Sequence, residues 1–126
     1  MRSETLQKQL SDIENISEEF IDYIVKQYME DIERGADLRD SVWPVRVPTY
    51  SLSKVILNAY TRLLARQLKG KACVNSVHPG YVRTSMTFNT GVISSVQGAE
   101  NVVRVTLLPP GGPTGQNFLE TQIAHF

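Results

Sequence analysis

Tyr50 and Lys54 are the two residues whose types and spacing offer chemistry. They lie four residues apart at the beginning of a long helical pattern, so a helix would place both side chains on one face, one turn apart. A cation at that distance favours the phenolate form of a tyrosine, and the pair can then give or take a proton near neutral pH. Chance alone gives about 0.2 such pairs in a chain of this composition, so the bare spacing favours an ordinary helix start.

A second group of candidate residues follows about 30 residues later, at the end of a predicted buried strand over 72–77. Pro79 fixes a turn there, and Gly80 lets a ligand approach the backbone closely. Arg83 offers a charge and Thr84 a hydroxyl group. In open α/β sheets ligands bind at the carboxyl ends of the strands. A Pro-Gly pair by itself is typical of a simple turn, but its combination with the Tyr50 helix predicts a site.

The elements that must position these residues are predicted from the spacing of apolar residues. Proline-containing residues 36–48 predict a loop, and 108–115 predict a turn. Alternating helices and strands indicate α/β layers with a parallel sheet. Two strands do not make a stable covered sheet, so either strands escape the pattern or the chain is part of a larger fold. The predicted elements are two helices within 3–34, a helix over 50–69, a strand over 72–77, a helix over 96–108 and a strand over 116–121.

The first two helices carry recognisable start signals. Ser11 followed by Glu14 matches a capping box. Ser17 is the better N-cap, because acidic residues follow it in the first turn, where the helix dipole favours them. Ile16 and Ile21 occupy the two positions of a hydrophobic staple. The helix after Ser17 has an apolar stripe and an acidic polar face, which predicts packing against the protein core rather than against a membrane.

Together these residues resemble the short-chain dehydrogenase/reductase superfamily. Its Tyr-x-x-x-Lys motif, following helix, buried strand and Pro-Gly-x-Val-x-Thr loop are similar to YSLSK, NAYTRLLARQL, ACVNSV and PGYVRT in this sequence. The resemblance implies that Tyr50 is the catalytic acid/base. It implies that Lys54 assists Tyr50 and holds the nicotinamide ribose. The loop would contact the nicotinamide and phosphates, through Pro79, Gly80, Val82 and Thr84.

The resemblance extends to the plant menthol dehydrogenase and salutaridine reductase group of this superfamily, and it runs from about Ser3 to Phe126. Similar segments are SDIENISEEFID (11–22), FNTG (88–91), GAENVVRVTLLP (98–109) and GPTGQNF (112–118). It implies the C-terminal portion of a Rossmann-type doubly wound parallel sheet, mostly helical with about two strands. Residues 1–45 would form an acidic helical insertion, and 46–126 the Tyr-x-x-x-Lys helix, strand, Pro-Gly loop, last helix and last strand.

The family motifs that precede this portion are absent from the sequence. These are the Thr-Gly-x-x-x-Gly-x-Gly turn, the Asn-Asn-Ala-Gly motif and the catalytic serine, after which Met1 falls. Asp37, Ser41, Ser51 and Ser53 are poor substitutes for that serine, because none lies at a predicted strand end. We therefore expect the chain to be the C-terminal part of a reductase, which accounts for the shortage of strands.

The activity implied by the resemblance is NADPH-dependent reduction of a ketone or aldehyde, or oxidation of an alcohol. NADP comes from the resemblance only; the residues themselves leave NAD open. A helical insertion covering the 50–69 helix implies that the complete enzyme is a monomer. The alternative is a truncated, non-catalytic remnant that acts at most as a binding module, through an uncovered sheet edge and helix faces.

Composition bounds the remaining function classes. A chain of 126 residues with 41% apolar residues fits one folded domain. Residues 1–40 carry 11 acidic and 5 basic side chains, and 41–126 carry 2 and 8, so the net charge is zero. Zero net charge argues against a nucleic-acid partner. No apolar run is long enough to span a membrane, and the N-terminus does not resemble a signal peptide. A cytoplasmic location is therefore expected.

Three isolated residues favour ordinary structural roles. His78 and His125 are too far apart in the sequence to predict a metal site, so no metal is expected. Cys73 lies within the predicted strand and is interpreted as a buried small apolar residue, and a lone cysteine suits a reducing compartment. Trp43 is interpreted as a packing anchor of the loop, with a substrate wall as the alternative.

Overall fold

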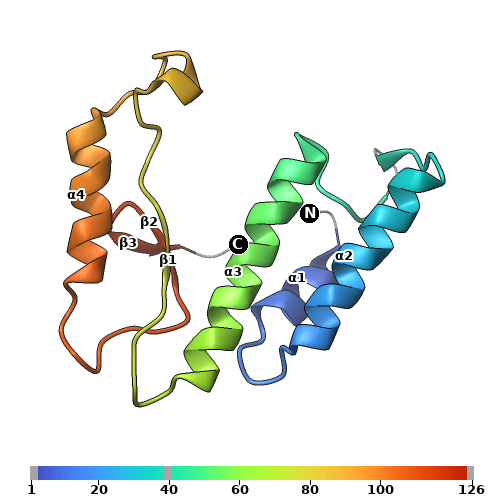
Figure 1. Cartoon of the computed structure of the whole chain (residues 1–126), viewed down its shortest axis with the longest axis horizontal. Coiled ribbons are helices and arrows are strands. Elements are labelled where there is room, and N and C mark those ends of the chain that lie inside the picture. Colours follow the sequence, from blue (N-terminus) through green and yellow to red (C-terminus); the bar gives the residue numbers. More distant parts are fainter. Residues whose placement is uncertain (1–2, 39–40, 125–126) are drawn as a thin grey trace.

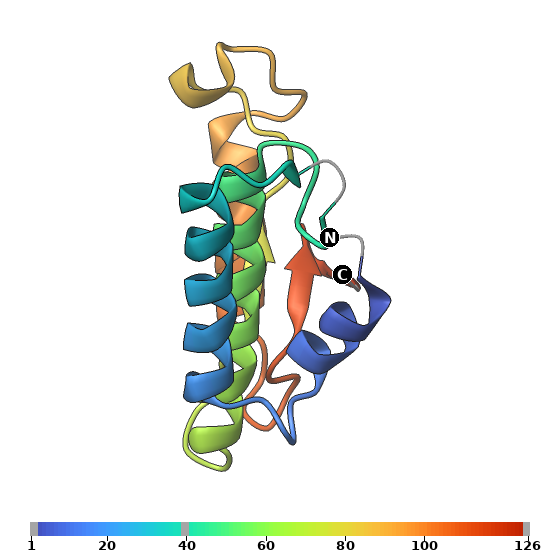
Figure 2. The same ribbon diagram turned by 90° about the vertical axis from the view of Figure 1, so that its right-hand side faces the viewer.

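The computed structural model describes residues 3–38 and 41–124 (Figure 1). Three helices pack together on one side, and a small sheet with the fourth helix lies on the other (Figures 1 and 2). A 3₁₀ turn, Ser85–Thr87, lies in the loop between the first strand and the fourth helix. The elements in chain order are α1 (Glu4–Ser11), α2 (Glu18–Glu33), α3 (Pro48–Gln67), β1 (Ser76–His78), α4 (Ser95–Thr106), β2 (Asn117–Leu119) and β3 (Gln122–Ala124).

The start of α2 follows the sequence signals. Ser17 has an extended backbone, and its hydroxyl oxygen accepts a hydrogen bond of 3.1 Å from the Phe20 amide. The side chains of the staple, Ile16 and Ile21, are both buried. The predicted capping box at Ser11 is wrong, because Ser11 is the last residue of α1. Asp12 follows it, and its carboxylate accepts hydrogen bonds from the amides of Glu14 and Asn15.

A compact apolar core joins α1, α2 and α3. Leu10 and Ile16 are its most completely buried large side chains. The connection between α1 and α2 is also held from α3, because the guanidinium of Arg66 donates hydrogen bonds to the carbonyls of Ile13, Glu14 and Ile16. One side chain thus satisfies three carbonyls of a segment without regular structure, which fixes the α1–α2 connection against the long helix.

Trp43 anchors the loop between α2 and α3, as predicted. Its ring is buried edge-on against Tyr28, with ring centroids 5.3 Å apart and an interplanar angle of 80°. The indole Nε1 donates a hydrogen bond of 2.8 Å to Asp31 on α2. Tyr28 in turn shares a hydrogen bond of 2.8 Å with Thr49 at the beginning of α3. The loop and the two helices therefore position one another.

The sheet is small and has the order β1-β2-β3. β1 and β2 are parallel, with Val77 opposite Phe118, and β2 and β3 are antiparallel. The parallel pair connected through α4 confirms the predicted fold class. The third strand was not predicted, because it is only three residues long and follows a turn at Glu120, whose φ is +57°. Such short strands depend on their partners rather than on their own pattern.

The first strand starts later than the sequence predicted. β1 contains Ser76–His78, whereas 72–75 are extended without strand pairing. There the backbone of Val74 bonds to loop residues instead, accepting from the Gly115 amide at 2.7 Å and donating to the Thr114 hydroxyl at 2.9 Å. Cys73 is exposed, so its interpretation as a buried strand residue is wrong. The cause is that Cys73 precedes the strand and borders the sheet edge that no described strand covers.

Two general features of the described residues bear on function. No helix in residues 3–38 and 41–124 is long and apolar enough to cross a membrane. Within the same residues no three His, Cys, Asp or Glu side chains gather closely enough to hold a metal ion. His125 lies outside the described residues.

Candidate functional site

Tyr50 and Lys54 lie together on one face of α3, as their spacing predicted. The ammonium nitrogen of Lys54 is 5.3 Å from the centroid of the Tyr50 ring. Both side chains are exposed, Tyr50 to 58%. A cation held over a phenol ring at this distance is attracted to its π face. The pair is thus preassembled on the helix and open to an incoming ligand.

The beginning of α3 is fixed by local contacts rather than by a polar N-cap side chain. Val47 precedes it with a φ of +44°, which turns the chain sharply into the helix, and Pro48 occupies the first turn. The Ser51 hydroxyl donates a hydrogen bond of 2.7 Å to the Arg46 carbonyl, which links the first turn of α3 to the residues before it. Together with the Tyr28–Thr49 hydrogen bond, this sets the orientation from which Tyr50 projects.

The serines near Tyr50 are committed to backbone contacts. Ser51 donates to the Arg46 carbonyl, and Ser53 donates to the Tyr50 carbonyl at 2.7 Å. Ser41 likewise donates to the Leu38 carbonyl at 2.8 Å, on the loop before α3. The three hydroxyl protons are therefore used in hydrogen bonds within the chain.

The Pro-Gly loop leaves β1 at its carboxyl end and is held from α4 and from the β2–β3 turn. The Asn101 side chain donates a hydrogen bond of 3.0 Å to the Pro79 carbonyl. Gly80 has a φ of +102°, and a Cβ there would lie 2.6 Å from Ile93 and 3.1 Å from the Glu120 carboxylate. The positive φ therefore favours glycine at position 80, and a side chain there would also displace the end of the Ile93 side chain.

The rest of this loop is pinned by a short parallel bridge that sequence reasoning missed. Val82 pairs with Ile93, and the Arg83 amide donates to the Ile93 carbonyl at 2.8 Å. A Cβ at Gly91 would lie 2.2 Å from the Val82 backbone, and one at Gly98 would lie 2.6 Å from a Val82 methyl group. The two glycines were the available signal, because each marks a close approach of backbone.

Thr84 is held by its own 3₁₀ turn. The Thr87 hydroxyl accepts from the Thr84 amide at 3.1 Å and lies 2.7 Å from the Val82 carbonyl. Thr84 starts the Ser85–Thr87 turn with an extended backbone. These contacts fix the Thr84 end of the loop locally, in addition to the contacts from α4 and Ile93 that hold its earlier residues.

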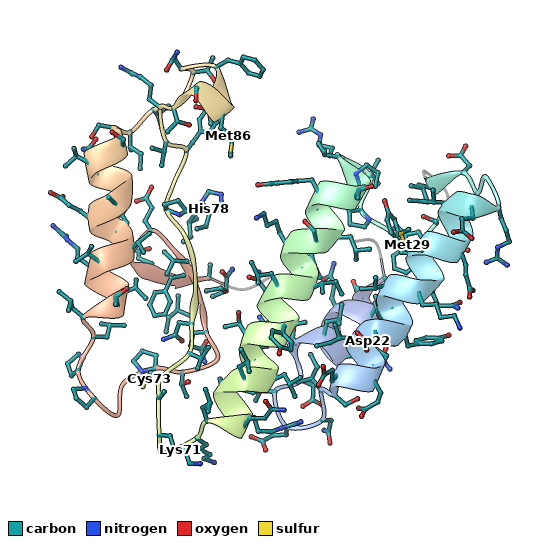
Figure 3. All side chains as sticks on the ribbon, viewed as in Figure 1. Asp22, Met29, Lys71, Cys73, His78 and Met86 are labelled. Atoms are coloured by element: carbon teal, nitrogen blue, oxygen red, sulfur yellow. The ribbon has the colours of Figure 1, made fainter. Side chains whose placement is uncertain are left out.

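The two groups of candidate residues lie at the same end of the molecule. Figures 1 and 2 show the beginning of α3 and the loop after β1 at one end. Figure 3 shows His78 and Met86, which bracket the loop, toward that end. Within the described residues no hydrogen bond joins Tyr50 or Lys54 to the Pro79–Thr84 loop. The two groups of residues therefore lie toward one end of the molecule, and each is supported by its own neighbours.

One small cavity lies elsewhere, between β1 and the end of α4. Its volume is about 180 Å³, and Cys73, Val77, Val105 and Pro113 are among its lining residues. No sequence signal pointed to it. The sequence also did not indicate that Arg62 on α3 is buried. Burial lowers the pKa of its guanidinium.

Comparison with known proteins gives relatives of one kind. No protein-family model matches the chain. The (+)-neomenthol dehydrogenase of Arabidopsis thaliana is 41% identical over 118 residues, which are 93% of this chain and 39% of that protein. Salutaridine reductase of Papaver somniferum is 39% identical over 113 residues, 90% of this chain and 36% of that protein. Carbonyl reductase (NADPH) 1 of Rattus norvegicus is 34% identical over 110 residues, 82% of this chain and 39% of that protein.

Solved structures agree with these relatives. The structure of salutaridine reductase from Papaver somniferum superimposes with a TM-score of 0.80 at 38% identity, covering 94% of this chain and 40% of that one. Menthone neomenthol reductase from Mentha piperita gives 0.72 at 27% identity, covering 97% of this chain and 36% of that one. The chain spans about 40% of the length of these proteins and matches their C-terminal part. The chain therefore belongs to the short-chain dehydrogenase/reductase family and contains the C-terminal part of its fold, as found in the plant neomenthol dehydrogenase and salutaridine reductase group.

Proposed function

We propose that this chain contributes the proton-transfer part of an NADPH-dependent carbonyl reductase. The observation that carries the proposal is the Tyr50–Lys54 pair, preassembled with 5.3 Å between ammonium and ring, exposed, and at the end of the molecule where the Pro-Gly loop lies. Relatives named as a carbonyl reductase using NADPH, a neomenthol dehydrogenase and a salutaridine reductase support the reaction class. The substrate would be a small ketone, aldehyde or alcohol.

The residues of the chain fit a nicotinamide cofactor at this end. The Lys54 ammonium makes no ion pair among the described residues and is exposed, so its protons are available to ribose hydroxyls. Pro79, Gly80, Val82 and Thr84 form an anchored loop at a strand's carboxyl end, which is where α/β folds bind nucleotides. NADPH, when bound, supplies the hydride for the carbonyl carbon.

Tyr50 then handles the proton in this proposal. Its hydroxyl gives a proton to the carbonyl oxygen as that oxygen gains negative charge, and it takes the proton back in alcohol oxidation. Lys54 keeps the phenolate form accessible through its nearby positive charge. In this proposal the part of the chain from residue 46 onward carries these groups, and α1 and α2 pack against α3 and support it.

The chain alone is expected to bind NADPH weakly and to turn over no carbonyl substrate. Its 126 residues contain no Gly-rich turn to seat the pyrophosphate. The removal of one hydrogen-bond donor to a developing oxyanion typically lowers the rate by about 10²–10³, so the absence of the family serine would weaken catalysis further. Fluorescence titration with NADPH measures the binding directly. Micromolar binding with NADPH oxidation that Tyr50→Phe abolishes would show that the chain assembles a competent site.

The catalytic role of Tyr50 is tested in a complete enzyme, made by joining the N-terminal part of salutaridine reductase to this chain. Tyr50→Phe is expected to lower kcat by at least about 10²-fold with little change in NADPH affinity, because only proton transfer is lost. Tyr60→Phe is the matched control, since Tyr60 is a second exposed tyrosine on α3. An equal loss in both variants, or no loss in Tyr50→Phe, contradicts the proposal.

A further inference from the structure

One peptide group of the candidate site is held at both of its ends by side chains. This peptide joins Pro79 to Gly80. Its carbonyl oxygen accepts a hydrogen bond of 3.0 Å from the Asn101 side chain on α4, and its N–H donates one of 3.1 Å to Nδ1 of His78. Because Nδ1 accepts this hydrogen bond, the ring proton of His78 lies on Nε2. Two side chains from different elements therefore fix the plane of this peptide.

The same peptide joins two parts of the chain that are each anchored independently. Before it, β1 is paired with β2, and the His78 carbonyl accepts a hydrogen bond of 2.7 Å from the Glu120 amide. After it, the Tyr81 carbonyl accepts a hydrogen bond of 2.8 Å from the Val92 amide. The direction in which the loop leaves the sheet is therefore set at this one peptide group.

The two backbone residues do not select this orientation by themselves. Gly80 has a φ of +102°, but glycine adopts positive and negative φ about equally readily. A flip of the peptide plane would make that φ negative, which glycine tolerates, and it would break both side-chain hydrogen bonds. Proline restricts its own φ, which does not determine the plane of the peptide that follows it. The observed orientation therefore depends on His78 and Asn101.

The His78 contact has the pattern of an Asx turn. In such a turn the side chain of Asn or Asp accepts a hydrogen bond from the backbone N–H two residues later. Here the imidazole Nδ1 supplies the acceptor in place of a side-chain oxygen. This equivalence provides a matched pair of substitutions: His78→Asn keeps an acceptor at this position, whereas His78→Phe keeps a planar ring and removes the acceptor.

We propose that His78 and Asn101 are positioning residues of the candidate site. They hold the Pro79–Gly80 peptide in the orientation that directs Val82 and Thr84 toward the nicotinamide end of NADPH, and they touch neither cofactor nor substrate themselves. The consequence for NADPH binding rests on the proposed function, whereas the two hydrogen bonds are a property of this chain alone.

The hydrogen bonds are tested by nuclear magnetic resonance on the chain of 126 residues. We expect a scalar coupling across the N–H···N hydrogen bond between the Gly80 amide nitrogen and His78 Nδ1. Asn101→Ala is expected to speed exchange of the Gly80 amide proton with solvent by about threefold or more, because both hydrogen bonds hold one plane. Glu100→Ala is the matched control, since Glu100 is the exposed neighbour of Asn101 on α4. Absence of the coupling, or equal exchange rates in the two alanine variants, would overturn the inference.

The consequence for cofactor binding is tested in the complete enzyme made by joining the N-terminal part of salutaridine reductase to this chain. His78→Phe is expected to raise the dissociation constant of NADPH by about threefold to tenfold, which is the net contribution of one hydrogen bond. The kcat at saturating NADPH should change little. His78→Asn is expected to restore the affinity of the parent enzyme. Fluorescence titration measures the affinity, and equal losses in the two variants, or no loss in His78→Phe, would contradict the inference.

The outcomes separate this inference from the proposed function. Tyr50→Phe probes proton transfer through kcat, whereas His78→Phe probes the position of the loop through NADPH affinity. A loss of kcat in Tyr50→Phe without a loss of affinity in His78→Phe contradicts the inference and leaves the proposed function standing. A complete enzyme that binds no NADPH, although the coupling between Gly80 and His78 is present, contradicts the proposed function and with it the positioning role.

Discussion

Asp31 shows how a single carboxylate holds a loop that has no regular structure. The hydrogen bond from the Trp43 indole is the largest cause that lowers the pKa of Asp31, and hydrogen bonding from Arg34 adds to it. A lowered pKa means that the ionised carboxylate is more stable in the folded chain than in the unfolded chain. The anchoring of residues 41–47 above α3 therefore depends on the charge of this residue.

This contact predicts a pH-dependent loss of stability in Asp31→Asn. The folded pKa lies below the ordinary value of 3.8, so the folded chain binds fewer protons near that pH and the contribution grows with pH. We expect the urea midpoint of Asp31→Asn to fall below that of the parent chain at pH 7. The difference should shrink as the pH falls through and below 3.8.

The control for this prediction is Glu33→Gln, at an exposed carboxylate on the same helix to which no donor is assigned. Trp43→Phe, which removes the indole donor, should reproduce the pH-dependent part of the Asp31→Asn effect. A difference between Asp31→Asn and the parent chain that is the same at pH 3 and pH 7 would show that the carboxylate charge is not what anchors Trp43.

At the residue scale, predictions from sequence were correct where the interaction is local. The Tyr50–Lys54 contact and the Ser17 cap need only the geometry of one helical turn. Cys73 was placed wrongly because burial depends on which strands flank it, and that is not encoded in the segment itself. The hydrogen-bond acceptor of Trp43 could not be predicted either, because Asp31 lies 12 residues earlier on another element.

At the scale of elements, the contact between α4 and the Pro-Gly loop predicts an unusual glycine effect. Glycine inside a helix is normally less stable than alanine by roughly 0.5–1 kcal/mol. At Gly98, however, a methyl group would lie 2.6 Å from the Val82 side chain. We expect Gly98→Ala to destabilise the chain by about 1–3 kcal/mol, because the loop must move away from the helix. Urea unfolding monitored by circular dichroism measures this difference.

A compensating substitution separates this crowding from a general helix defect. Val82→Ala removes the methyl groups that Gly98→Ala would meet, so the double variant should recover most of the stability lost in Gly98→Ala. Additive losses in the double variant, or a stabilising effect of Gly98→Ala alone, would mean that α4 does not press against the loop as described.

Helices were predicted far better than strands, for a physical reason. α2, α3 and α4 begin or end within a few residues of their predicted bounds, since apolar periodicity and caps are written into the helix itself. The Ser94–Gln97 capping box of α4 was an unused signal of the same kind. β1 and β3 are only three residues long, and each pairs with β2. Segments this short have no apolar pattern from which a strand could be predicted.

For the whole molecule, the packing of α1 and α2 on α3 predicts the oligomeric state of the proposed complete enzyme. α1 and α2 pack on α3 through a shared core that includes Leu10, Leu52 and Leu63. These contacts cover one apolar face of α3, so that face is not free for pairing between subunits. We expect the complete enzyme to sediment as a monomer. A stable dimer formed through residues 50–69 would contradict this.

The whole fold was accessible from sequence only through the family resemblance. Residue patterns alone predicted α/β layers and exposed a shortage of strands, and the motifs around Tyr50 and Gly80 then accounted for that shortage. The anchoring of the site by Asn101, Ile93 and Glu120 was not accessible, because those residues come from three later segments that meet only in the folded chain.

Cys73 is exposed, so a spectroscopic probe can be attached to it. It is the single cysteine of the sequence, so a thiol-reactive fluorophore attaches at one defined point without any substitution. That point lines the cavity beside the β1 edge. Alkylation of Cys73 by a maleimide should be fast in the isolated chain and should slow at least tenfold in the complete enzyme, where the joined N-terminal part covers the edge, and an attached dye should shift its emission to the blue. An alkylation rate that stays the same in the complete enzyme would mean that the joined part leaves this edge uncovered.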